Sequence, residues 1–138
     1  MLARAMRWTY MVIAWIVLVA VIVQFFLAGL GVFAGVSNFQ MHRSLGYSLP
    51  LLMLLGLLAA FAARLPWKVI GLTALLPALV ILQSVFIGLW QPGTNSIAAL
   101  HVVNGLAIFS LAGFLALRAR QYMTIPKLVA VKADAATP

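Results

Sequence analysis

Apolar residues dominate four long segments of the chain, and short stretches that are polar or turn-forming separate them. The segments run from about Trp8 to Phe33, Met41 to Ala63, Trp67 to Trp90 and Ile97 to Leu117. A helix needs roughly 20 predominantly apolar residues to cross the hydrocarbon core of a bilayer, and each segment reaches that length. The pattern therefore predicts four transmembrane helices.

The connections between these segments are short. They read AGVSNFQ, RLP and QPGTNS, and the last contains the turn formers Pro, Gly and Asn. Short connections make consecutive helices antiparallel. We therefore expect an all-α, up-down-up-down bundle of four transmembrane helices over residues 1–122. After Tyr122 the composition changes, and residues 123–138 are expected to form a weakly ordered cytoplasmic tail.

Composition agrees with a membrane protein and removes several kinds of chemistry. Hydrophobic residues make up 66% of the chain and charged residues 7%, whereas about 25% of a soluble protein is charged. There is no cysteine, which excludes disulfides, thiolate metal sites and iron–sulfur clusters. Asp134 is the only acidic residue, so no pair of carboxylates is available for acid–base catalysis or for a carboxylate-rich metal site.

The basic residues predict the orientation of the chain. Eight of the nine would lie on one side of the membrane: Arg4, Arg7, Arg64, Lys68, Arg118, Arg120, Lys127 and Lys132. The positive-inside rule then places both termini in the cytoplasm and the chain in the inner (plasma) membrane. The first apolar run is about 26 residues, too long for a signal-peptide core, so it is expected to be an anchor helix. The partner of these charges is expected to be anionic lipid, not nucleic acid.

The chain also contains an internal repeat. A shift of 59 residues superimposes unusual residues of the first half on the second: Trp8 on Trp67, Gln24 on Gln83, Gly29-Leu30 on Gly88-Leu89, His42 on His101, and Gly46 on Gly105. This predicts two tandem helical hairpins related by a pseudo-twofold axis along the membrane normal. Four unrelated apolar helices are the alternative.

The only two histidines occupy matching places in this repeat, in QMHRSLG and LHVVNG. Ionisable residues in a membrane usually face the interior of a bundle, so His42 and His101 are expected to point at one spot from diagonal helices. Imidazole is a good ligand for transition metals. A zinc site needs three or four protein ligands, which the chain lacks. Haem needs only two axial ligands, so the pair predicts an iron site that holds one haem b.

Neighbouring residues extend this prediction. Gly46 and Gly105 follow the histidines by four residues, on the same helix face, where they would leave room for a porphyrin. Gln24 and Gln83 would donate to a propionate or orient an imidazole, and Arg43 would pair with a propionate. The simpler interpretations are close helix packing for the glycines, interhelical hydrogen bonds for the glutamines, Asn104 and Ser110, and a solvated His42.

Two resemblances follow from these residues. From Trp8 to Arg120, the pattern VQFFLAGLGVF, F-x-x-H-R-x-L-G, LQSV and ALH-x-VNG resembles a family of small bacterial four-helix membrane proteins of unknown function. More distantly, the arrangement is similar to one half of haem A synthase and to other four-helix membrane cytochromes b. The second resemblance implies that His42 and His101 are axial ligands of a b-type haem near the outer leaflet.

The chain departs from haem A synthase in two ways. The synthase has a glutamate shortly before a histidine, where this chain has Asn38 and Phe39, and it has an outer-loop cysteine pair that is absent here. Oxygen insertion into a haem methyl and a second haem are therefore not expected. Of the functions that the resemblance implies, haem binding and electron transfer are still expected.

The predicted function is thus a membrane b-type cytochrome that exchanges electrons with a quinol or a membrane redox partner, and electron transfer is favoured over catalysis. The first alternative is a cofactor-free accessory or assembly subunit of a larger membrane complex. The second is a small transporter or proton path that uses His42, His101, Gln24 and Gln83 as polar steps, although no acidic relay residue lies in the membrane segments.

Overall fold

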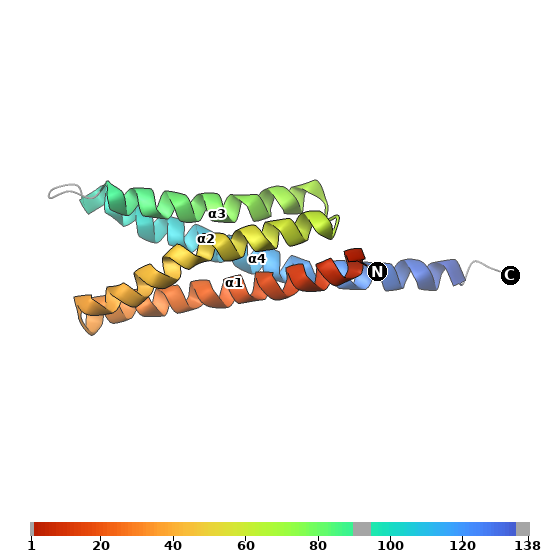
Figure 1. Cartoon of the computed structure of the whole chain (residues 1–138), viewed down its shortest axis with the longest axis horizontal. Coiled ribbons are helices and arrows are strands. Elements are labelled where there is room, and N and C mark those ends of the chain that lie inside the picture. The colour runs from red at the N-terminus through yellow and green to blue at the C-terminus, as the bar shows by residue number, and fades with distance from the viewer. Residues whose placement is uncertain (1, 90–94, 135–138) are drawn as a thin grey trace.

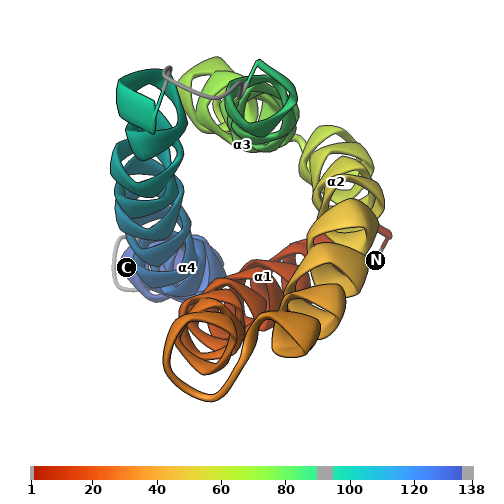
Figure 2. The same ribbon diagram turned by 90° about the vertical axis from the view of Figure 1, so that its left-hand side faces the viewer.

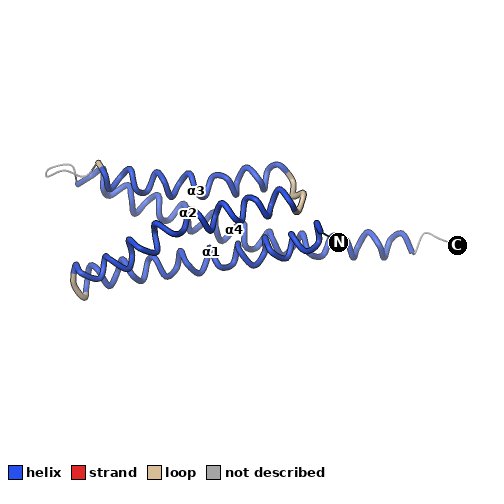
Figure 3. Tube along the Cα trace, in the orientation of Figure 1, coloured by secondary structure: helices blue, strands red, loops and turns tan. Residues whose placement is uncertain are grey.

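The computed structural model describes the backbone of residues 2–89 and 95–134, and the side chains of residues 2–89 and 96–123. The elements are α1 (Leu2–Phe33), a short 3₁₀ helix (Val36–Asn38), α2 (Phe39–Ala62), α3 (Trp67–Gly88) and α4 (Asn95–Asp134). Figure 3 shows that the described chain is helical except for its connections. The predicted all-α, up-down-up-down fold is confirmed.

Two helix boundaries differ from those expected of the apolar segments. α1 begins at Leu2 instead of Trp8, because LARAMR consists largely of good helix formers that continue the helix beyond its apolar part. The backbone of α4 continues to Asp134, through most of the stretch assigned to a tail, where KLVAVKAD again contains helix-forming Lys, Leu and Ala. Trp90 and residues 135–138 lie outside the described residues.

All four helices are long and apolar enough to cross a membrane. The spans are Leu2–Phe33, Val36–Ala62, Trp67–Gly88 and Ser96–Met123. Figure 1 shows the hairpin α1–α2 beside the hairpin α3–α4, and the view along the bundle in Figure 2 shows the helices as a ring in chain order. α4 returns to contact α1, whereas the diagonal pairs α1–α3 and α2–α4 lie farther apart. This is the arrangement of two tandem hairpins.

The two ends of the bundle differ in packing. We call the end where α1 finishes at Phe33 and α2 begins at Phe39 the histidine end, and the end where α2 finishes and α3 begins the arginine end. Beyond Leu49 of α2, Val80 of α3 and Asn104 of α4, no described residue nearer the histidine end of these helices is buried. The hairpins diverge towards this end (Figure 1). The packed core thus belongs to the middle and to the arginine end.

Small residues build that core. α2 buries Ala59, Ala60 and Ala63, and α4 buries Ala112, Ala116 and Ala119. Small side chains let helix backbones approach closely, and this replaces the hydrophobic driving force that lipid does not provide.

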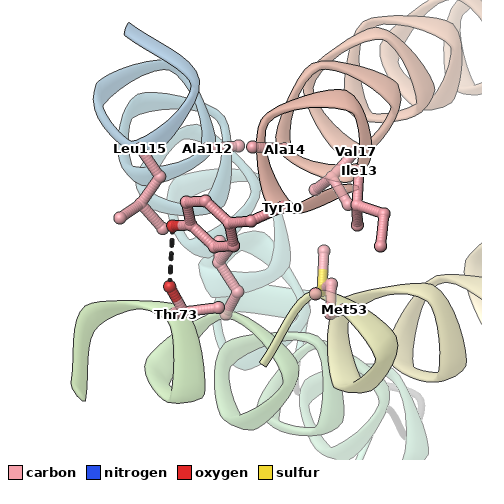
Figure 4. Close-up of a pocket in the computed structure, with 10 residues that line it drawn as sticks. Tyr10, Ile13, Ala14, Val17, Met53, Thr73, Ala112 and Leu115 are labelled. Atoms are coloured by element: carbon pink, nitrogen blue, oxygen red, sulfur yellow. Dashed lines mark hydrogen bonds between the residues drawn. The ribbon is translucent and has the colours of Figure 1, made fainter. Parts of the chain in front are cut away.

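A buried hydrogen bond crosses the ring between diagonal helices. The hydroxyl oxygens of Tyr10 and Thr73 are 2.9 Å apart, as the dashed line in Figure 4 shows. The Thr73 hydroxyl donates to the Val69 carbonyl, so Tyr10 must donate to Thr73. A cavity of about 20 Å³ adjoins Tyr10 and Thr73, room for about one water molecule. This cavity is too small to hold a cofactor.

Gly31, near the end of α1, packs against the first residue of α2. A Cβ at Gly31 would lie 2.6–2.7 Å from three ring carbons of Phe39, whereas a Cβ at Gly29 would meet nothing within 4 Å. Gly31→Ala is therefore expected to displace Phe39 and to lower the unfolding free energy by about 1 kcal/mol or more, despite the better helix propensity of alanine.

Thermal unfolding in detergent, followed by circular dichroism, measures this effect. Gly29→Ala is the matched control and is expected to keep or raise the unfolding temperature. Equal destabilisation by both substitutions would contradict the packing described for Phe39.

Candidate functional site

The structure brings the two histidines together at the histidine end. His42 is the fourth residue of α2 and His101 the seventh of α4, so they approach from diagonal helices. Their ring centroids are 6.1 Å apart and the ring planes are inclined by 58°. Both side chains are half-buried and lie beyond the packed core. Two imidazoles far apart in sequence thus face one another across the ring of helices.

Each imidazole is held by a backbone carbonyl of the preceding helix. His42 Nδ1 is 3.0 Å from the Gln24 carbonyl oxygen, and His101 Nδ1 is 3.2 Å from the Gln83 carbonyl oxygen. A carbonyl only accepts hydrogen bonds, so Nδ1 carries the proton in both rings and Nε2 carries the lone pair. Metal-binding histidines are typically fixed in this way, with one nitrogen bonded to a carbonyl and the other free to ligate.

The repeat therefore appears in the hydrogen bonds as well as in the sequence. Both bonds join residues 18 positions apart. The glutamines were expected to orient the imidazoles or a propionate through their side chains. In the structure, their main-chain carbonyls orient the imidazoles instead.

The Gln83 side chain forms hydrogen bonds with α4. Its Nε2 donates to the His101 carbonyl at 2.8 Å, and its Oε1 accepts from Asn104 Nδ2 at 2.5 Å. Asn104 Nδ2 also donates to the Leu79 carbonyl at 2.8 Å. Asn104 was not predicted to belong to the site, but the interhelical hydrogen bonds expected of it are confirmed. These contacts tie α3 and α4 together beside His101.

The first half of the repeat lacks this connection. The residue that matches Asn104 in the repeat is Leu45, which cannot donate a hydrogen bond. Gln24 Oε1 is buried and has no hydrogen-bond partner in the described part of the chain. An unsatisfied polar atom is costly in an apolar environment. The two halves of the site thus share the hydrogen bond between imidazole and carbonyl, but they differ in the hydrogen bonds of the glutamine side chains.

The two glycines make room for the glutamines. A Cβ at Gly46 would lie 2.9 Å from Gln24 Nε2, and a Cβ at Gly105 would lie 3.3 Å from Gln83 Nε2. These positions therefore face side-chain amides, and not the open space beside a porphyrin for which they were predicted. Arg43 is exposed at the histidine end, next to His42 in sequence.

The donor set fits an iron that brings its own equatorial ligands. A metal–imidazole bond is about 2 Å long and the ring centroid lies about 1 Å behind the nitrogen, so two imidazoles on opposite sides of one metal have centroids about 6 Å apart. The observed separation is 6.1 Å. Among the described residues no group of three or more His, Cys, Asp and Glu side chains could hold a metal ion. Two nitrogens suffice for haem, and the diverging hairpins leave this end without a packed core.

Comparison with known proteins gives one similarity. Residues 24–89, just under half of the chain, match a family of unknown function (DUF6220). No curated protein and no solved structure matches the chain. The matched segment includes Gln24, His42, Gly46 and Gln83 but ends before His101, and the family carries no activity that could be transferred.

Proposed function

We propose that this protein is a membrane b-type cytochrome in which His42 and His101 ligate one haem for electron transfer. The observation that carries the proposal is the pair of imidazoles, 6.1 Å apart between centroids, each bonded through Nδ1 to a backbone carbonyl. When bound, the haem would supply a one-electron iron couple inside the membrane.

The chain itself supplies ligation and positioning. The Gln24 and Gln83 carbonyls hold the two Nε2 atoms in the ligating tautomer, and the hydrogen bond raises the basicity of each imidazole. His42 and His101 would both hold the iron and leave it no open position, which would favour electron transfer over oxygen chemistry. The exposed Arg43 guanidinium is available to a propionate carboxylate at the same end.

The charge distribution supports an orientation for this site. Arg64 and Lys68 lie at the arginine end, and Arg43 is the only basic residue at the other end. By the positive-inside rule the arginine end and both termini face the cytoplasm, and the chain lies in the inner (plasma) membrane. The histidine site then lies near the outer leaflet, where a quinol or a membrane redox partner would exchange electrons with it.

A reduced-minus-oxidised absorption spectrum tests the proposal. The full chain is expressed with a haem precursor and purified in detergent through a tag without histidine, because the chain has only two histidines of its own. We expect narrow Soret and α bands of a low-spin haem at about one haem per chain. The matched control carries His42→Ala and His101→Ala together and should show neither band.

A wild-type chain without these bands, although haem is available, would contradict the proposal. The cofactor-free accessory subunit would then account better for the bundle, and proteins that co-purify with it would be the next question. Liposome flux that depends on both histidines would favour the transporter instead.

A further inference from the structure

More hydrogen bonds connect the surroundings of His101 than those of His42. Around His101, the imidazole donates to the Gln83 carbonyl, the Gln83 side chain donates to the His101 carbonyl, and Asn104 donates to Gln83. Asn104 is further tied to the Leu79 carbonyl of α3. Moving His101 therefore requires breaking a connected set of hydrogen bonds between two helices.

Around His42, the structure has one side-chain hydrogen bond and an edge-on contact with the Phe39 ring, whose centroid is 6.3 Å from that of His42. His42 Nδ1 bonds to the Gln24 carbonyl. Leu45 stands where the second half has Asn104, and Gln24 Oε1 is buried without a partner in the described residues. The Gln24 amide is thus not anchored as the Gln83 amide is, although both lie against a glycine of the next helix.

The two histidines also differ in their distance from the start of their helices. His42 lies in the first turn of α2, and the residue before that turn, Asn38, makes no side-chain capping hydrogen bond. The 3₁₀ helix Val36–Asn38 continues directly into this turn, and the Phe39 amide donates to the Val36 and Ser37 carbonyls. The place of His42 near the start of the helical segment, and not a missing cap, therefore distinguishes it, because helix ends open at lower cost than helix interiors. Gly35, with φ of 123°, lies just before the 3₁₀ helix, a conformation that glycine adopts readily. His101 is further from the start of its helix, at the seventh position.

We propose that His42 is the displaceable axial ligand and that a diatomic gas molecule, such as carbon monoxide, nitric oxide or dioxygen, binds on the His42 side. This inference rests on the proposed haem site and adds reversible gas binding to it. In the resting protein both imidazoles ligate. The gas competes with His42 alone, while His101 keeps the haem in the bundle.

Carbon monoxide added to the dithionite-reduced protein tests this inference, with the Soret and α bands as the readout. We expect the wild-type bands to shift saturably to those of a carbon monoxide complex. Leu45→Asn places an amide where the second half has Asn104, and should weaken carbon monoxide binding about fivefold to tenfold by giving Gln24 Oε1 a partner. Ser44→Asn, at the neighbouring exposed position, is the matched control and should leave the affinity unchanged.

Asn104→Leu is the reciprocal variant. It removes the amide beside His101, and is expected to strengthen carbon monoxide binding about fivefold, because His101 then becomes displaceable as well. This variant keeps the inference open to refutation if Leu45→Asn fails to fold, which the low-spin spectrum before gas addition reports.

The outcomes separate this inference from the proposed function. Low-spin bands that do not respond to saturating carbon monoxide would overturn the displaceable His42 and leave the cytochrome standing. Equal affinities of the wild type, Leu45→Asn and Asn104→Leu would overturn it too. A wild-type chain without any haem bands would overturn both.

Discussion

Alanine at either His42 or His101 will abolish the low-spin spectrum of the haem-loaded protein, and alanine at His101 will also lower its haem content by about tenfold or more. Each substitution removes one of the two imidazoles, whose ring centroids are 6.1 Å apart in the bundle. The loss at His101 should be larger because Gln83 and Asn104 hold that side in place, and such supporting contacts are worth about tenfold to a hundredfold in metal affinity. His42→Ala should retain a high-spin haem on His101.

Haem per chain and the absorption spectrum measure both effects. Ser110→Ala is a suitable control, because Ser110 is exposed on α4 and its hydroxyl bonds only to the Leu106 carbonyl of the same helix. The control should match the wild type. A single-histidine variant that keeps the low-spin bands would show that its imidazole is not an axial ligand.

The second large effect is expected far from the histidines. Ala116 is 0% exposed in the packed core of the arginine half. Ala116→Phe inserts a ring where the helices are in close contact, and should lower the unfolding free energy by about 3 kcal/mol. Thermal unfolding in detergent, followed by circular dichroism, measures the change.

The adjacent residue provides the control for this substitution. Leu117 is 59% exposed on the outer surface of α4, so Leu117→Phe should leave the unfolding temperature close to that of the wild type. Comparable losses at both positions would mean that the small residues of α4 do not form the packed interface described here.

The fold could be predicted from the sequence because lipid restricts the possible structures so strongly. Four apolar segments with short connections can cross a bilayer only as antiparallel helices, since each backbone amide and carbonyl must be satisfied within its own helix. The extension of α1 to Leu2 was not predicted. It depends on helix propensity outside the apolar segments, which hydropathy does not report.

The site could be predicted at the level of residues but not of atoms. The matching positions of His42 and His101 in the repeat indicated that the two rings meet, and their centroids are 6.1 Å apart. Periodicity tells which helix face a residue occupies, but not whether its side chain or its carbonyl makes the contact. The glutamines were expected to orient the imidazoles, and only the structure shows that their main-chain carbonyl oxygens do so.

The difference between the two halves needed the structure. The exchange of Asn104 for Leu45 is visible in the repeat. The effect of this exchange on the hydrogen bonds cannot be seen in the sequence, because it depends on the burial of Gln24 Oε1 and on the bond between Asn104 and Gln83. The same holds for Gly46, which faces the end of the Gln24 side chain.

Pulsed electron paramagnetic resonance of the oxidised, haem-loaded protein tests the central claim most directly. The chain is grown with ¹⁵N-labelled histidine and purified without a histidine tag, so that its two histidines are the only source of the label. The account predicts a low-spin ferric signal coupled to ¹⁵N from two imidazoles in the wild type, and a high-spin ferric signal coupled to ¹⁵N from one imidazole in His42→Ala. A low-spin signal without ¹⁵N coupling, or with one labelled imidazole in the wild type, would contradict ligation by His42 and His101 together.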